Sequence, residues 1–156
     1  MTVIDLCQQL EDLRRRYPEY RRSDHALREL QALWGGADCN DCGVFERVET
    51  IRIELDAQKS WYGEVHIAIA PNGWHSVSTS YWYGQGGGGS SPSVWNDIAY
   101  TTRDEAVTAG INKLIATFEG VRDGKGSVPH NQFILAERMI ATLNAYLSQA
   151  RQLTLF

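Results

Sequence analysis

The sequence predicts an α+β protein in which an antiparallel meander sheet of three or four strands is packed by two N-terminal and two C-terminal helices. Near both ends of the chain, apolar residues recur every three or four positions, as in amphipathic helices. Over residues 46–83 they instead alternate with polar residues, as in half-buried strands. The 156 residues, 43% hydrophobic and 22% charged, suffice for one core. We expect a single domain over 1–150 and a tail over 151–156.

The two N-terminal helices are predicted over residues 2–17 and 24–34. The first has its apolar stripe at Val3, Leu6, Leu10, Leu13 and Tyr17. Pro18 ends it, because proline disfavours a helical conformation in the residue before it. Ser23 or Asp24 caps the second helix, and the pair Gly35-Gly36 stops it. These helices would form a hairpin.

The strands are predicted in the middle of the chain. Alternation over 48–55 and over 64–69 gives two strands, and Pro71-Asn72-Gly73 is a strong signal for a tight turn. The return strand follows over 74–83. A fourth, short strand is expected around 94–100.

The C-terminal helices are predicted from about Thr102 to Phe118 and from about His130 to Gln149. Thr102 and Glu105 have the spacing of a capping box at the start of the first of these. Its buried stripe is Val107, Ile111, Leu114 and Phe118. The buried stripe of the last helix is Phe133, Ala136, Ile140, Leu143 and Leu147. Gly120 and the polar residues after it form the loop between them.

The net charge of −4 is unevenly distributed along the chain. Residues 36–102 carry three basic and eight acidic side chains, which does not suit a phosphate-binding surface. The one basic cluster is RRRYPEYRR, over residues 14–22, and we expect weak phosphate contacts from it. Its arginines are Arg14, Arg15, Arg16, Arg21 and Arg22. The exposed end of a helical hairpin would have the same composition, so that alternative stays open.

The aromatic and glycine-rich residues of the second half of the sheet are candidates for partner binding. A glycine loop that cradles phosphate leads into a helix or ends in Gly-Lys-Ser/Thr, and GQGGGGSSPS does neither. We expect a long mobile loop, which can become ordered on a partner. Aromatics on a sheet can stack single-stranded bases, but the acidic surroundings favour core packing or a protein interface. The candidate residues are Tyr81, Trp82, Tyr83, Gly86, Gly87, Gly88 and Gly89.

Metal-binding and catalytic signatures are weak. Cys39 and Cys42 have the C-x-x-C spacing, but zinc takes four ligands and no second pair follows; a turn with two incidental cysteines is the alternative. The four histidines lie at no metal-ligand spacing. We therefore expect no metal and no cofactor, and we favour a binding protein over an enzyme, although a catalytic site built from distant residues stays open.

The expected location of the protein in the cell rests on the absence of a secretory signal and of a membrane-spanning segment in the sequence. Three cysteines and no secretory signal indicate reduced thiols in the cytoplasm. No apolar run approaches the ~20 residues that a membrane span needs.

The last five residues, QLTLF, are the most informative motif. They hold two leucines and a phenylalanine, whereas chain ends are usually polar and frayed. The pattern Q-L-x-L-F resembles the peptide by which bacterial DNA polymerases, mismatch-repair proteins and replication-control proteins dock on the sliding clamp. That consensus favours Ser or Asp where this chain has Thr154. The resemblance implies that Gln152 hydrogen-bonds at the rim of the clamp pocket and that Leu153 covers a shallow part. Leu155 and Phe156 would fill the deep part.

The resemblance implies a small cytoplasmic bacterial accessory protein, including one encoded by a plasmid or phage. Its partner would be the DNA polymerase sliding clamp, the beta subunit, and its role would lie in DNA replication or repair or their modulation. Contact with DNA would be indirect or weak, and no membrane would be involved. The alternative is a non-enzymatic inhibitor or adaptor that uses the aromatic sheet and the glycine-rich loop. In that case the tail packs on the protein's own core, extends the last helix, or adds an edge strand.

Overall fold

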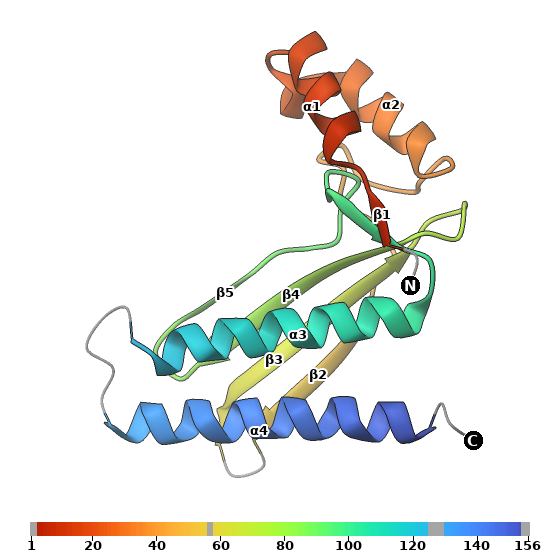
Figure 1. The fold of residues 1–156 in the computed structure, drawn as a ribbon. Helices are drawn as coiled ribbons and strands as arrows, with labels where there is room; N and C mark the ends of the chain where they lie inside the picture. Colours follow the sequence, from red (N-terminus) through yellow and green to blue (C-terminus); the bar gives the residue numbers. More distant parts are fainter. Residues whose placement is uncertain (1–2, 56–57, 125–129, 154–156) are drawn as a thin grey trace. The chain divides into compact units, whose positions relative to one another are not determined.

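The computed structural model describes residues 3–55, 58–124 and 130–153, and it confirms the α+β class (Figure 1). The antiparallel sheet has the strand order β1-β6-β4-β3-β2, and β5 pairs with β4. The helices are α1 (Cys7–Arg16), the 3-10 turn η1 (Tyr20–Arg22), α2 (Asp24–Leu33), α3 (Arg103–Arg122) and α4 (His130–Leu153). The strands are β1 (Val3–Asp5), β2 (Glu49–Leu55), β3 (Gln58–Ile69), β4 (His75–Tyr83), β5 (Gly87–Gly89) and β6 (Ile98–Tyr100).

The start of the chain departs from the predicted helix over 2–17. Residues 3–5 form β1, which pairs antiparallel with β6 so that Val3 lies opposite Tyr100. The Leu6 amide donates to the carbonyl of Asp97 at 2.7 Å, and α1 begins only at Cys7. Pairing with a strand far along the sequence therefore overrides the local helical period here.

The chain divides into two compact units. Unit 1 comprises Met1–Glu49, His66–Ser78 and Ser91–Val107. Unit 2 comprises Thr50–Val65, Thr79–Ser90 and Thr108–Phe156. Strands β3 and β4 and helix α3 contribute residues to both units.

The core of unit 1 is built around Trp34, which is fully buried. Its ring makes edge contacts with Phe45 and Trp74, both at 5.6 Å between centroids. Its indole N–H donates to the carbonyl of Val94 at 3.2 Å, so the polar end of the ring is also satisfied. The same cluster includes leucines from the hairpin and small residues from β3 and β6: Leu6, Leu10, Leu13, Leu30, Ala68 and Ala99.

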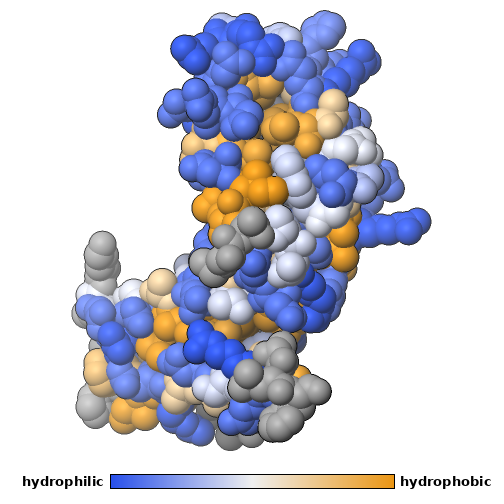
Figure 2. All heavy atoms as spheres, turned by 45° about the vertical axis from the view of Figure 1, so that its right-hand side comes forward, coloured by the Kyte–Doolittle hydropathy of each residue, from blue (hydrophilic) through white to orange (hydrophobic). Residues whose placement is uncertain are grey.

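The helical hairpin of unit 1 forms as predicted. The Ser23 hydroxyl caps α2 by accepting from the Ala26 amide at 3.3 Å, and Gly35 and Gly36 end the helix with φ of 81° and 87°. Arg16 of α1 holds Glu29 of α2 through two hydrogen bonds of 2.8 and 2.7 Å. Figure 2 shows that the outer surface of this hairpin is mostly hydrophilic on the side drawn, as an amphipathic pair requires.

Unit 2 packs α3 and α4 on the sheet. The Phe118 ring of α3 stacks on Trp61 of β3 at 6.2 Å and meets Tyr81 of β4 edge-on at 6.0 Å. Helix α4 runs beside α3, and Arg122 joins the two helices through a 3.0 Å ion pair with Glu137 (Figure 1). The buried apolar residues of α4 are Ala136, Met139, Leu143 and Leu147; Phe133, predicted to be buried, is 42% exposed, and Ile140 is half-buried. Both helices extend about one turn beyond their predicted ends.

The glycine-rich stretch contains a strand where the sequence predicted only a mobile loop. Strand β5 pairs with β4 in the register Ser80↔Gly89, Tyr81↔Gly88 and Trp82↔Gly87. A Cβ on Gly87 would collide with the Tyr81 carbonyl, and one on Gly89 would collide with the Ser80 side chain. Glycine is therefore favoured at Gly87 by the close approach of the β4 backbone and at Gly89 by the Ser80 side chain.

Two glycines of α3 are expected to respond in opposite directions to alanine. A Cβ on buried Gly110 would collide with the branched side chain of Val65, whereas a Cβ on exposed Gly120 would meet no atom within 4 Å. Gly110→Ala should lower the free energy of unfolding by about 1–3 kcal/mol through overpacking. Gly120→Ala should raise it by about 0.5–1 kcal/mol through helix propensity. Urea unfolding followed by circular dichroism measures both, and shifts of the same sign would contradict this packing.

Candidate functional site

The end of α4 carries the first two residues of the clamp-like motif. Apolar side chains of α4 are buried as far as Leu147, and none of residues 148–153 is buried. Gln152 is exposed, and 80% of Leu153 is exposed. Leu153 thus extends the helix, as one alternative expected, without packing on the core. Thr154, Leu155 and Phe156 lie outside the described residues.

The aromatic residues proposed for partner binding differ in how exposed their side chains are. Tyr81 and Tyr83 are half-buried, stack on each other at 6.3 Å, and pack against Phe118 and Trp61 respectively. Trp82 is 39% exposed. Gly86 is half-buried, and Gly87, Gly88 and Gly89 are exposed along β5. Of the three aromatics, Trp82 therefore offers the most surface to a partner.

The two cysteines of the C-x-x-C spacing lie in a turn. Cys39 is half-buried and forms an isolated bridge with Phe45, and its sulfur accepts a hydrogen bond of 3.2 Å from Gln31. Burial raises the pKa of the Cys39 thiol. Cys42 is exposed, and both thiols are free. Within the part of the chain that the structure describes, no three His, Cys, Asp or Glu side chains gather as metal ligands do.

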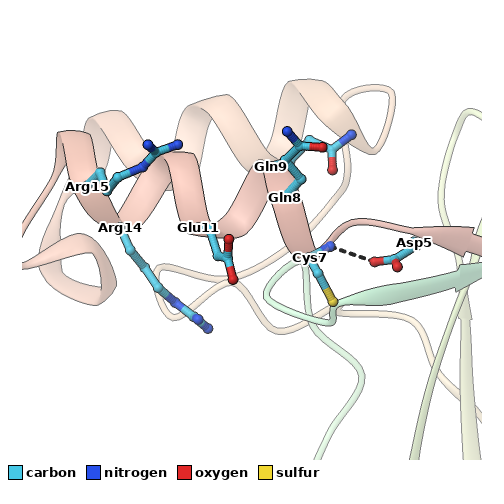
Figure 3. A pocket seen from close by; sticks show the side chains of 7 residues that line it. All are labelled: Asp5, Cys7, Gln8, Gln9, Glu11, Arg14 and Arg15. Atoms are coloured by element: carbon cyan, nitrogen blue, oxygen red, sulfur yellow. Dashed lines mark hydrogen bonds between the residues drawn. The ribbon is translucent and has the colours of Figure 1, made fainter.

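A hollow of about 850 Å³ runs along the exposed side of α1 (Figure 3). It is lined by Asp5, Cys7, Gln8, Gln9, Glu11, Arg14 and Arg15. Asp5 accepts a 2.8 Å hydrogen bond from the Cys7 amide. The hydrogen bond of the thiol to Asp5, with partial desolvation and the charges of Asp5 and Asp97, raises the pKa of Cys7 to about 11. Since the thiolate is the nucleophile, this exposed cysteine is poorly suited to catalysis near neutral pH.

The reactivity of Cys7 tests this electrostatic account. Asp5→Asn keeps an oxygen that can accept from the Cys7 amide but removes the charge, so the thiol pKa should fall and the thiolate fraction at pH 8 should rise. Alkylation of Cys7 by iodoacetamide should accelerate roughly five- to ten-fold, as followed by peptide mass spectrometry. The rate at Cys42 serves as the internal control, and an unchanged rate at Cys7 would refute the effect of Asp5.

The five arginines predicted to contact phosphate are not equivalent. Arg16 binds Glu29 and also Asp12, at 2.9 Å, and Arg15 lies 3.7 Å from Asp12. Arg14, Arg21 and Arg22 make no ion pair in the described ranges. Figure 3 shows Arg14 and Arg15 leaving α1 on different sides.

Trp95, which lies far along the sequence from residues 14–22, packs against this basic cluster. Its ring meets Tyr20 edge-on at 5.6 Å, and the Arg21 guanidinium lies 6.0 Å from its centroid. Because Trp95 and Arg21 are far apart in the sequence, the sequence alone does not predict this contact. Only the proximity of the 91–97 loop to η1, a tertiary feature, brings them together.

Comparisons with known proteins add no assignment. No protein-family model matches the chain, and no significant match is found among curated proteins or among solved structures. No helix of the described residues is long and apolar enough to cross a membrane. A function must therefore be argued from this chain's own residues.

Proposed function

We propose that this protein binds the bacterial sliding clamp through residues 152–156 and acts in DNA replication or repair or their modulation. The observation that carries the proposal is the Q-L-x-L-F pattern, which resembles the clamp-docking peptide at all four of its specified positions. The accessibility of the first two residues supports it, because Gln152 and Leu153 are exposed in the last turn of α4.

The conformation of α4 is compatible with docking. Residues 148–153 are exposed or half-buried, so unwinding this end to fit a pocket would remove no side chain from the core. Helix ends with few buried contacts open at low cost in free energy. The motif can therefore adapt to a clamp pocket while the rest of unit 2 stays folded.

The energetics favour a weak and reversible complex. Burying two leucines and a phenylalanine stabilises a complex by roughly 4–9 kcal/mol before costs. Ordering the segment and losing rigid-body freedom offset several kcal/mol of this. A tether of this kind suits a protein that shares the clamp with polymerases. The globular part would be carried to DNA by the clamp, so its acidic middle need not bind DNA itself.

The proposal is tested by deleting the motif. A purified bacterial clamp is immobilised, and binding of the intact chain is compared by surface plasmon resonance with that of a chain ending at Arg151. We expect saturable binding that the deletion abolishes. As a matched control, Ser148→Ala/Gln149→Ala alters two exposed residues of the same helix and should bind as the intact chain does. Binding that survives the deletion would place the contact elsewhere and overturn the proposal.

A further inference from the structure

Within the basic cluster of residues 14–22, three of the five arginines are left without a carboxylate partner in the described part of the chain. Arg16 is held by Asp12 and Glu29, and Arg15 lies 3.7 Å from Asp12, so these two arginines already face a carboxylate. Arg14, Arg21 and Arg22 are exposed. Desolvating a guanidinium is favourable only when an anion replaces the water, so these three are the members of the cluster that an anionic ligand can pair with.

Two aromatic rings lie under the guanidinium groups of Arg14 and Arg21. Arg14 and Arg21 lie over Tyr20, at 5.3 and 5.7 Å from its centroid, and Arg21 also lies over Trp95. Arg21 donates to the Tyr20 hydroxyl at 3.3 Å. The Trp95 indole N–H donates to the carbonyl of Cys42 at 2.8 Å, which fixes the ring. Contact through the face of a guanidinium leaves the N–H groups at its edge for an anion, apart from the one that Arg21 donates to Tyr20.

A hollow of about 280 Å³ lies beside the Tyr20 ring, lined by Pro18, Glu19, Tyr20, Arg21 and Arg22. Its volume is at the lower end of that of ligand pockets, which suits a phosphate or sugar-phosphate group better than a whole metabolite. Glu19 is the one acidic residue of the lining, so the arginines dominate its charge.

We propose that Arg14, Arg21 and Arg22, arranged around Tyr20 and Trp95, bind the phosphodiester backbone of a nucleic acid. A nucleic-acid strand presents phosphates at regular intervals, so several separate guanidinium groups on one surface can each meet one. The five arginines of residues 14–22 make this patch basic, whereas residues 36–102 carry net negative charge, so contact would be confined to the patch. The inference is independent of clamp binding, because it uses none of residues 152–156.

The number of arginines in the patch predicts the salt dependence and the affinity of nucleic-acid binding. Contacts with about three phosphates give a salt slope of roughly −2 for a single strand and −3 for a duplex. The dissociation constant should lie in the range of non-specific binding, about 10⁻⁴ to 10⁻⁶ M. Such contact supplements a tether and does not select a sequence.

The test measures fluorescence anisotropy of a labelled 20-nucleotide single strand, and of its duplex, at several salt concentrations between 50 and 200 mM. The variant Arg14→Ala/Arg21→Ala/Arg22→Ala should bind at least about ten-fold more weakly and with a shallower salt slope. A control variant removes the same charge from exposed positions outside the patch: Arg28→Ala, Lys113→Ala and Arg138→Ala. It should lose less than about three-fold. Trp95→Phe should retain binding, and Trp95→Ala should weaken it, because only the latter removes the ring that holds Arg21.

The comparison of the single strand with the duplex identifies which form of nucleic acid the protein binds. If the protein binds the single strand or the duplex more tightly than the other, this result supports the proposal and assigns the patch to that form of nucleic acid. Equal losses in the patch variant and the control variant, or no binding of either form at 50 mM salt, overturn the proposal. Displacement of the oligonucleotide by an equal charge concentration of polyglutamate would also overturn it, in favour of an acidic protein partner. Deletion of residues 152–156 should leave the anisotropy unchanged. A negative result for nucleic-acid binding can therefore be distinguished from a negative result for clamp binding.

Discussion

Replacement of Leu155 and Phe156 by alanine is expected to weaken binding to the sliding clamp by at least about 100-fold. These two residues would fill the deep part of the clamp pocket, and each should contribute roughly 1.5–3 kcal/mol of apolar burial. The double change should therefore lose about 3–6 kcal/mol, and every 1.4 kcal/mol is a factor of ten in affinity. Isothermal titration of the clamp with each protein gives the two dissociation constants.

Two controls make this result specific. Leu153→Ala should cost less, about ten-fold, since a shallow contact buries less apolar surface. Ser148→Ala/Gln149→Ala should leave the affinity within about two-fold, as expected for residues outside a binding hot spot. An affinity that is the same in the Leu155→Ala/Phe156→Ala variant as in the intact chain would contradict the assignment of these side chains to the pocket.

The largest loss of stability is expected from Trp34→Ala. The change removes a fully buried indole between Phe45 and Trp74 and leaves the Val94 carbonyl without its donor. Large-to-small changes of this kind cost about 3–5 kcal/mol, a large part of the roughly 5–15 kcal/mol that typically separates native from unfolded domains. Chemical unfolding followed by circular dichroism measures the difference.

Trp82→Ala is the matched control for that experiment. It removes the same side chain from a position that is 39% exposed, and it should cost no more than about 1 kcal/mol. Similar losses for the two tryptophans would mean that Trp34 does not organise the core of unit 1.

Local signals in the sequence were enough to place several element boundaries. Ser23 caps α2, Gly35 and Gly36 end it, and the Thr102 hydroxyl accepts a hydrogen bond from the Glu105 amide at the start of α3. Such contacts join residues only a few positions apart, so residue type and spacing predict them.

The features that the sequence did not predict depend on residues that are distant in the chain. Val3–Asp5 fits a helical stripe and becomes a strand only because β6 lies beside it. Gly87–Gly89 has a low intrinsic preference for a strand and forms one because β4 requires a neighbour without side chains. Trp95 joins the arginine patch through packing on Tyr20. Periodicity and composition contain no information about such tertiary contacts.

The two candidate sites also differ in how far the sequence alone predicts them. Residues 152–156 form a linear motif, so the sequence alone suggests a partner, and the structure adds that Leu153 is exposed. The arginine patch is not linear. The sequence contains five arginines in this region, but only their pairing with Asp12 and Glu29 separates Arg15 and Arg16 from the three that remain available.

The central claim, that a short peptide supplies the contact with the clamp, is tested most directly by competition. The intact protein is bound to an immobilised bacterial clamp, and a synthetic peptide of residues 148–156 is added in increasing excess. We predict complete displacement, with a dissociation constant for the peptide within about ten-fold of that of the intact chain, because rigid-body costs are similar and the globular part adds no clamp contact. An intact protein that never binds the clamp, or that stays bound when the peptide saturates it, would contradict the account.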